Sequence, residues 1–304
     1  MKREQLKIYL AFFITCTVWG STWMFIRYGL NSMPPLFSAG LRFLVTLPVL
    51  YGYVLWKKIP NPFRQQERWL IFVMGIFSFF FPFAFIYWAE QYVPTGLSSI
   101  LFAVYPFCVA IFSHLSLKDE PLSVWKILGI ICGFSGVVVI FYDGIFIQNT
   151  LTLIGMALII LSAVFQGYVV ILIKKYGHDV HPMALNLGAM SVGAPLLLLA
   201  SVILERNSSF GFTPTAVFSI FYLAIIGSIF TFASYYWLLK RVEAVFLSLI
   251  AFVTPILAVI LGAIFLKEKL QPKTFLGASI VLAGILIANG GSFISSLSQQ
   301  KLKS

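Results

Sequence analysis

Long runs of apolar residues alternate with short polar breaks along the whole chain, and this alternation predicts the secondary structure. A helix needs about 20 mostly apolar residues to cross the hydrocarbon core of a bilayer, and the runs approach this length. The breaks, such as NSMPP and EQYVPTG, carry proline, glycine and charged residues. The pattern predicts ten transmembrane helices, which start near Ile8, Leu36, Trp69, Thr95, Val124, Leu151, Met183, Thr215, Ala244 and Thr274.

The composition agrees with this pattern and excludes a soluble protein. The 304 residues are 60% hydrophobic and 10% charged, whereas soluble domains are about 45–50% apolar and about 25% charged. No break is long enough to hold a separate catalytic or nucleic-acid-binding domain. The expected fold class is an all-α polytopic membrane protein, and we expect no enzyme activity, no cofactor, no metal site and no nucleic-acid partner.

The distribution of Lys and Arg predicts the orientation in the membrane. With the N-terminus in the cytoplasm, fifteen of the 21 basic residues fall on the cytoplasmic side, as the positive-inside rule favours. The break KEKLQPK is an exception on the outer side. The start MKREQLK imitates a signal peptide, but the apolar run after it is long and lacks a small-residue cleavage site. We expect a multi-pass protein of the inner (plasma) membrane with both termini in the cytoplasm.

An internal repeat divides the chain into two halves. Offsets of 149 and 148 residues align Tyr87-Trp88 with Tyr236-Trp237, Pro106 with Pro255, Glu120 with Glu268, Gly129 with Gly277, and Gly136 with Gly284. The repeat predicts two five-helix units. Because five is odd, the second unit enters the membrane from the opposite side, which gives inverted repeats. Inverted repeats are typical of transporters that open a midplane site first to one side and then to the other.

Several motifs in the two halves resemble a known family. They are Trp19-Gly20-Ser21-Thr22-Trp23, Leu41-Arg42-Phe43, Pro106 with Leu117-Lys118-Asp119-Glu120, and Gly129 with Gly136, followed in the second half by Pro255, Glu268, Gly277 and Gly284. They resemble the EamA repeat of the drug/metabolite transporter superfamily, with one copy over residues 12–141 and another over 152–289. The resemblance implies ten helices, cytoplasmic termini, a central cavity and transport of small metabolites. Phe165-Gln166-Gly167 departs from the Trp-Gly-Ser motif, so the role of the first helix is not carried over to the sixth.

Charged residues are rare inside the predicted spans. Arg42 is the only basic residue well inside one, where a charge costs about 2.5–3.5 kcal/mol on insertion scales. It can snorkel outward, bond backbone carbonyls or contact an anionic substrate group, and we favour a structural role. Glu90, at the outer end of the third span, is the best candidate for proton coupling or for attracting a cation at the outer mouth, and the alternative is an interfacial residue that faces water. We expect Glu120 and Glu268 to cap helices or to pair with nearby lysines.

The fourth and ninth spans are the expected walls of the central site. Pro106 and Pro255 hold equivalent mid-span positions, where a proline frees a carbonyl and bends the helix. The polar side chains around them are Ser99, Tyr105, Ser248 and Thr254. These side chains can line a cavity or bond to neighbouring helices.

Aromatic and amide side chains complete the set of candidate binding residues. Trp19 and Trp23 lie deep in the first span, one turn apart on one face, and can stack on an aromatic or cationic substrate. Gln166 and Tyr168 lie at membrane depth in the sixth span, where they serve either an interhelical bond or a cavity.

These features predict an inner-membrane exporter or exchanger that carries small metabolites by alternating access. Amino acids and related amphipathic compounds are the expected cargo, because aromatic and hydroxyl side chains with one arginine suit a zwitterion. A passive channel or facilitator and a multidrug-type exporter of cations are the alternatives. The expected partners are the small-molecule substrate and the lipid bilayer, and both a monomer and a homodimer are compatible with the sequence.

Overall fold

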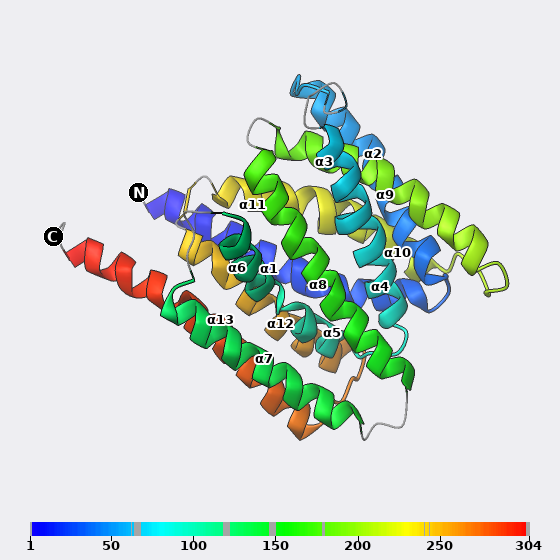
Figure 1. Ribbon diagram of the computed structural model, residues 1–304. Helices are drawn as coiled ribbons and strands as arrows, with labels where there is room; N and C mark the ends of the chain where they lie inside the picture. Colours follow the sequence, from blue (N-terminus) through cyan, green and yellow to red (C-terminus); the bar gives the residue numbers. More distant parts are fainter. Residues whose placement is uncertain are drawn as a thin grey trace.

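Helices are the regular elements of the described part of the protein (Figure 1). The computed structural model describes residues 2–61, 63, 68–117, 122–145, 150–177, 180–239, 241–242 and 244–301. In chain order the elements are α1 (Lys2–Leu30), α2 (Pro35–Trp56), α3 (Arg68–Met74), η2 (Gly75–Phe80), α4 (Phe81–Ala89), α5 (Thr95–Phe102), α6 (Tyr105–Ser116), α7 (Val124–Ile145), α8 (Thr150–Tyr176), α9 (Pro182–Leu204), α10 (Pro214–Phe221), η3 (Tyr222–Phe230), α11 (Thr231–Leu239), α12 (Ala244–Phe265) and α13 (Pro272–Lys301). The elements η2 and η3 are π-helices.

These elements form ten apolar spans in the described residues, which confirms the prediction. Seven are long enough to cross a membrane, and three shorter apolar helices cover Val124–Ile140, Pro214–Phe230 and Leu249–Phe265. Every span after the first begins within two residues of its predicted start. The first helix begins at Lys2 instead of Ile8, because a polar helical turn is stable where water reaches it. The start of α1 and the end of α13 lie on the same side of the molecule (Figure 1).

The third and eighth spans share an unusual construction. Each consists of an α-helix, a π-helix and a second α-helix. The 149-residue offset places η2 on residues 224–229, within η3. In η3 the Ser228 hydroxyl donates to the Leu223 carbonyl at 2.9 Å. The Thr231 hydroxyl donates to the Ile226 carbonyl at 2.6 Å. The internal repeat is therefore present in the backbone as well as in the sequence.

The two equivalent prolines have different effects on their helices. Pro106 lies at the start of α6, after a break at Ala103 and Val104, so the fourth span consists of two helices. Pro255 lies inside α12, which continues from Ala244 to Phe265. A proline removes one helical hydrogen bond at either position, but only the fourth span separates into two parts.

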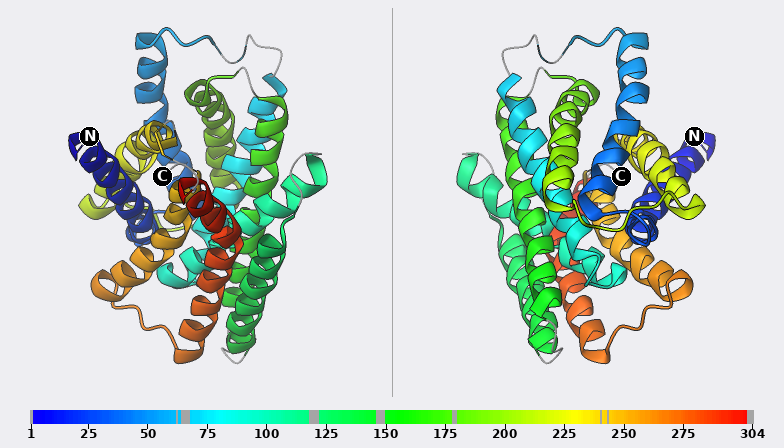
Figure 2. Two further views of the ribbon diagram at one scale, coloured as in Figure 1. Left: turned by 90° about the vertical axis from the view of Figure 1, so that its left-hand side faces the viewer. Right: turned by 90° about the vertical axis from the view of Figure 1, so that its right-hand side faces the viewer.

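The fifth and tenth spans, α7 and α13, lie side by side (Figures 1 and 2). Glycines bring their backbones together. A Cβ atom at Gly284 would lie 2.5 Å from the Gly133 nitrogen, and one at Gly136 would lie 2.6 Å from the Gly277 carbonyl oxygen. Small residues at regular spacing allow such close approach between helices in membranes. This contact gives a physical reason for the glycines that recur in both halves.

Two carboxylates of the second half cap helices of the first half. Glu205 accepts hydrogen bonds from the Leu36 and Phe37 amides near the start of α2, at 2.7 and 3.0 Å. Glu268 accepts from the first two amides of α5, at 2.8 and 3.1 Å. Each carboxylate satisfies amides that a helix start leaves free and complements the helix dipole. The capping role expected for Glu268 is confirmed, whereas Glu120 lies outside the described residues.

The helix starts capped by Glu205 and Glu268 lie at the end of the bundle where α1 and α4 terminate. Glu90 follows α4 at this end, the Glu90 end of the bundle. Inside the bundle, apolar residues of α2, α4, α9 and both π-helices form one core cluster. Phe43 of α2 lies edge-on to Phe79 and Phe83, with ring centres 5.1 and 4.7 Å apart. This core surrounds Arg42, a buried charged residue of α2.

We predict that Gly284→Val disrupts the contact between α7 and α13. The added carbons would overlap the Gly133 backbone, and overpacking of this kind typically costs about 1–3 kcal/mol. A lower melting temperature in detergent, measured by thermal unfolding, is the expected result. The control is Gly52→Ala in α2, where an added Cβ meets no atom within 4 Å. Equal melting temperatures for the two variants would contradict the packing role of Gly284.

Candidate functional site

Arg42 is buried in α2, with 6% of its surface exposed. Its Nη2 donates a hydrogen bond of 3.2 Å to the Ser228 hydroxyl in η3. The guanidinium carbon lies 5.3 Å from the ring centres of Phe43 and Phe83, and Nε has no hydrogen-bond partner. No carboxylate in the described residues forms an ion pair with Arg42. One hydroxyl and two rings compensate a buried cation only in part, so this position is complementary to a negatively charged group.

The π-helix η3 positions Ser228 against Arg42. A π-helix inserts one extra residue into a helical turn and shifts the direction of the side chains after it, and it is frequent at functional sites. Thr46, one turn after Arg42 in α2, also contributes to the contact between α2 and η3. Its hydroxyl donates to the Arg42 carbonyl at 2.9 Å and lies 3.3 Å from the Ala224 carbonyl of η3. The two halves of the repeat therefore meet at Arg42.

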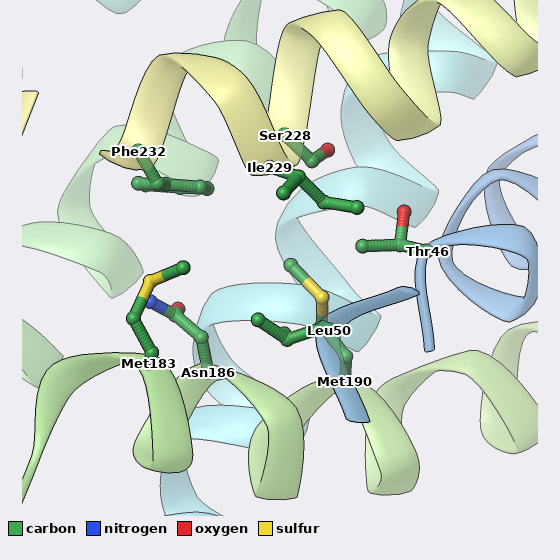
Figure 3. Close-up of a pocket in the computed structure, with 8 residues that line it drawn as sticks. All are labelled: Thr46, Leu50, Met183, Asn186, Met190, Ser228, Ile229 and Phe232. Carbon is green, nitrogen blue, oxygen red and sulfur yellow. The ribbon is translucent and has the colours of Figure 1, made fainter. Parts of the chain in front are cut away.

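A small cavity lies beside this contact, between α2, α9, η3 and α11 (Figure 3). Its lining residues are Thr46, Leu50, Met183, Asn186, Met190, Ser228, Ile229 and Phe232. Most of these side chains are apolar, and Thr46 and Ser228 place hydroxyls near Arg42. The cavity thus combines an apolar wall with two hydroxyls, and Arg42 lies behind Ser228 outside the lining, an arrangement that suits a small amphipathic molecule.

Asn186 supplies a second polar group on the opposite wall. Its side chain extends from α9 into the cavity, beside Met183 (Figure 3), and 4% of the residue is exposed. Within the described residues the Asn186 amide makes no hydrogen bond. A buried amide offers two donors and an acceptor, and leaving them unpaired is unfavourable. The amide is therefore available to a bound molecule.

The two halves differ in charge at equivalent positions. Met190 corresponds to Arg42 at an offset of 148 residues, and Leu239 corresponds to Glu90 at an offset of 149. The second five-helix unit folds with an apolar residue at both places. Neither buried charge is therefore required by the architecture of the unit itself, which favours a functional role for both.

The predicted tryptophans lie near the cavity but do not line it. Trp19 contacts Phe232 and Tyr235, with ring centres 6.0 and 5.4 Å apart. Because Phe232 lines the cavity, Trp19 lies directly behind its wall. Trp23 is 7% exposed and contacts Phe102 at 5.7 Å. Trp19 therefore supports the wall of the cavity in this conformation, whereas Trp23 packs in the core.

The polar residues predicted around the two prolines lie outside the cavity lining. Ser99 is buried in α5, and Tyr105 stacks on Phe102 with ring centres 5.9 Å apart. Thr254 has a buried hydroxyl without a hydrogen-bond partner. The side chain of Ser248 is outside the described part of the structure.

The two predicted residues of the sixth span lie farther from the site. Gln166 is half-buried in α8. Tyr168 is 46% exposed and contacts Phe112 edge-on at 5.4 Å. Neither side chain lines the cavity beside Arg42.

Glu90 is completely buried at the end of α4. Arg27 donates a hydrogen bond to the Glu90 backbone carbonyl and not to its carboxylate. One carboxylate oxygen, Oε2, accepts from the Thr95 hydroxyl at 3.5 Å, while Oε1 has no partner. Glu90 is therefore not an interfacial residue that faces water in this conformation.

Three lining residues, Thr46, Asn186 and Ser228, were not predicted from the sequence. Each is an uncharged polar residue within an apolar run, a pattern that many helix-packing residues share. Their polar side chains can be read from the sequence. Only the position of η3 against α2 and α9 distinguishes them from polar residues that pack between helices.

Sequence comparison assigns the family. The profile of the EamA-like transporter family matches residues 6–142 and 153–290. The chain therefore belongs to the EamA-like transporter family, a family of membrane transporters and not of enzymes.

Relatives of similar length agree with this assignment. The chain is 25% identical over 283 residues to "Uncharacterized transporter YoaV" of Bacillus subtilis, covering 93% of this chain and 97% of that protein. It is 27% identical over 299 residues to "Uncharacterized inner membrane transporter YedA" of Escherichia coli, covering 96% and 94%. A solved crystal structure shares the fold with a TM-score of 0.66 at 17% identity, covering 92% of this chain and 96% of the other. The chain is therefore a multi-pass membrane transporter.

We predict that Arg42→Met preserves the fold. Methionine is the equivalent residue of the second half, and replacing a buried charge by an apolar side chain is often neutral or stabilising. Thermal unfolding in detergent is expected to give a melting temperature equal to or above that of the unmodified protein. Phe43→Ala, which empties a neighbouring core position, is expected to lose about 3–5 kcal/mol. If both variants lose stability equally, Arg42 is a structural residue.

Proposed function

We propose that this protein is an inner-membrane secondary transporter that exports or exchanges small amphipathic metabolites carrying a carboxylate. The observation that carries the proposal is the buried Arg42 guanidinium, which has no anion within the described residues and lies beside a cavity. A substrate carboxylate at Arg42 would supply the missing charge and could accept bidentate hydrogen bonds.

The lining of the cavity favours a small amphipathic substrate. In this conformation the cavity has room for only about one water molecule, so substrate binding requires the lining helices to move apart. The Asn186 amide can bond a second polar group of the substrate, while Met183 and Phe232 contact its apolar part. Amino acids and related zwitterions combine these features in one small molecule.

Alternating access is the mechanism that the repeats support. Two five-helix units with equivalent π-helices can exchange conformations, and the cavity lies where elements of both units meet. The distribution of basic residues favours cytoplasmic termini, which would place the Glu90 end on the outer side. The Escherichia coli relative is named as an inner membrane transporter, which supports the same membrane for this chain.

The two alternative functions, a cation exporter and a passive channel, require different properties of the site. An exporter of cations would need a negative or neutral cavity, and the unpaired positive charge of Arg42 opposes a bound cation. A passive channel would conduct without a saturable binding step. Counterflow distinguishes a channel from a carrier, because only a carrier accelerates uptake of labelled substrate when unlabelled substrate is present inside.

The test is transport in proteoliposomes with a panel of amino acids, other small carboxylates and organic cations. We expect saturable uptake and counterflow for at least one carboxylate-bearing compound. A protein that transports only cations, or none of the compounds, would contradict the proposal.

For a transported carboxylate, we predict that Arg42→Met reduces transport at least tenfold, because the buried anion loses its charged partner. Asn186→Leu is expected to weaken apparent affinity by less, since it removes neutral hydrogen bonds. Leu44→Ala on the exposed face of α2 is the control and should transport normally. Normal transport by Arg42→Met would exclude Arg42 as the carboxylate site.

A further inference from the structure

A second group of polar side chains connects the cavity to the Glu90 end of the bundle. Six buried side-chain atoms of the described residues have no hydrogen-bond partner, and four of them belong to Arg42, Tyr87, Glu90 and Ser98. Buried polar atoms without partners are uncommon, and each needs an explanation. Their concentration in one chain of neighbouring residues suggests a common cause.

Tyr87 links the two buried charges. It is fully buried in α4, one turn before Glu90. It also lies one turn after Phe83, whose ring centre is 5.3 Å from the Arg42 guanidinium carbon. Its hydroxyl forms no hydrogen bond with Arg42 or with Glu90. Arg42 and Glu90 therefore lie along the same buried face of α4, where charges are weakly screened.

The surroundings of Glu90 stabilise the neutral acid more than the carboxylate. Arg27 of α1 faces Glu90, but its hydrogen bond goes to the backbone carbonyl. Glu268, from the connection after α12, adds a second negative charge nearby. From α5, Thr95 offers one long hydrogen bond, and the Ser98 hydroxyl lies close without forming one. An ionised Glu90 carboxylate in these surroundings has no ion pair to compensate the cost of burying its charge.

We propose that Glu90 is a proton-binding site whose occupancy is coupled to carboxylate binding at Arg42. The inference rests on the proposed function. The proton adds to a Glu90 carboxylate oxygen and forms the neutral acid, while the substrate carboxylate binds Arg42 beside the cavity. An ionised Glu90 would offset part of the positive charge of Arg42 and repel the substrate carboxylate. A neutral Glu90 has neither effect.

This coupling has a definite sign. Proton binding strengthens carboxylate binding, and by linkage carboxylate binding strengthens proton binding by the same factor. The proton and the substrate therefore travel in the same direction. Efflux of an accumulated metabolite carries protons out with it, and the two gradients together set the direction of net flux.

The first experiment measures proton movement with a substrate that the panel identifies. Proteoliposomes are loaded with this substrate and with a pH-sensitive dye, and efflux is started by dilution. We expect the lumen to become more alkaline as substrate leaves. In Glu90→Gln, which resembles the protonated acid, we expect efflux to continue without a change in luminal pH.

Substrate affinity supplies a second readout from the same proteins. Raising the external pH is expected to weaken binding roughly tenfold, within the usual range of coupling between two sites, and Glu90→Gln is expected to bind independently of pH. Glu4→Gln, the same substitution at an exposed position of α1, is the control and should behave like the unmodified protein. Efflux without proton movement, proton movement that persists in Glu90→Gln, or coupling to sodium in place of protons would each overturn the inference.

Infrared spectroscopy tests the proton site without any substrate. At neutral pH the unmodified protein is expected to show the carbonyl band of a protonated carboxylic acid, and Glu90→Gln is expected to lose it. Identical carboxylic acid bands in both proteins across the pH range would refute a proton on Glu90. If no compound in the panel shows saturable flux, the proposed function fails, while the infrared result still decides whether Glu90 binds a proton.

Discussion

A guanidinium buried without an anion is the interaction on which the site depends. In the low-dielectric interior, Arg42 is held by one hydroxyl and two aromatic rings, which leaves part of its burial cost uncompensated. The hydroxyl comes from Ser228, in the other half of the chain. One contact between the two repeats lies at this charge, and the cavity and the buried Glu90 lie on either side of it.

The two repeats combine a symmetric backbone with asymmetric chemistry. Both units contain a π-helix at the equivalent place, and α7 and α13 meet through glycines from both units. The buried charges Arg42 and Glu90 belong to the first unit, and Met190 and Leu239 stand at the equivalent positions of the second. The symmetric parts provide two similar bodies that can move against each other, while the asymmetric residues provide binding and coupling.

The apolar pattern predicted the spans well because the bilayer sets their length and excludes unsatisfied backbone groups. It also drew attention to Arg42 and Glu90, since charges within or near apolar runs are costly. The expected binding walls around Pro106 and Pro255 do not line the cavity in this conformation. A cavity depends on which helix faces meet, and hydroxyls such as that of Thr46 look the same in sequence whether they face a ligand or another helix.

The sequence by itself determined the number of spans, the duplication and the two isolated charges, because these depend on local hydrophobicity and on comparison of the chain with itself. The tertiary structure decided that Arg42 meets Ser228, that Asn186 faces a cavity and that Glu90 is buried next to Tyr87. These contacts join residues up to 186 positions apart, and one of them depends on a π-helix that shifts the register of a span. Only the packing of complete helices determines which side chains such a shift brings together.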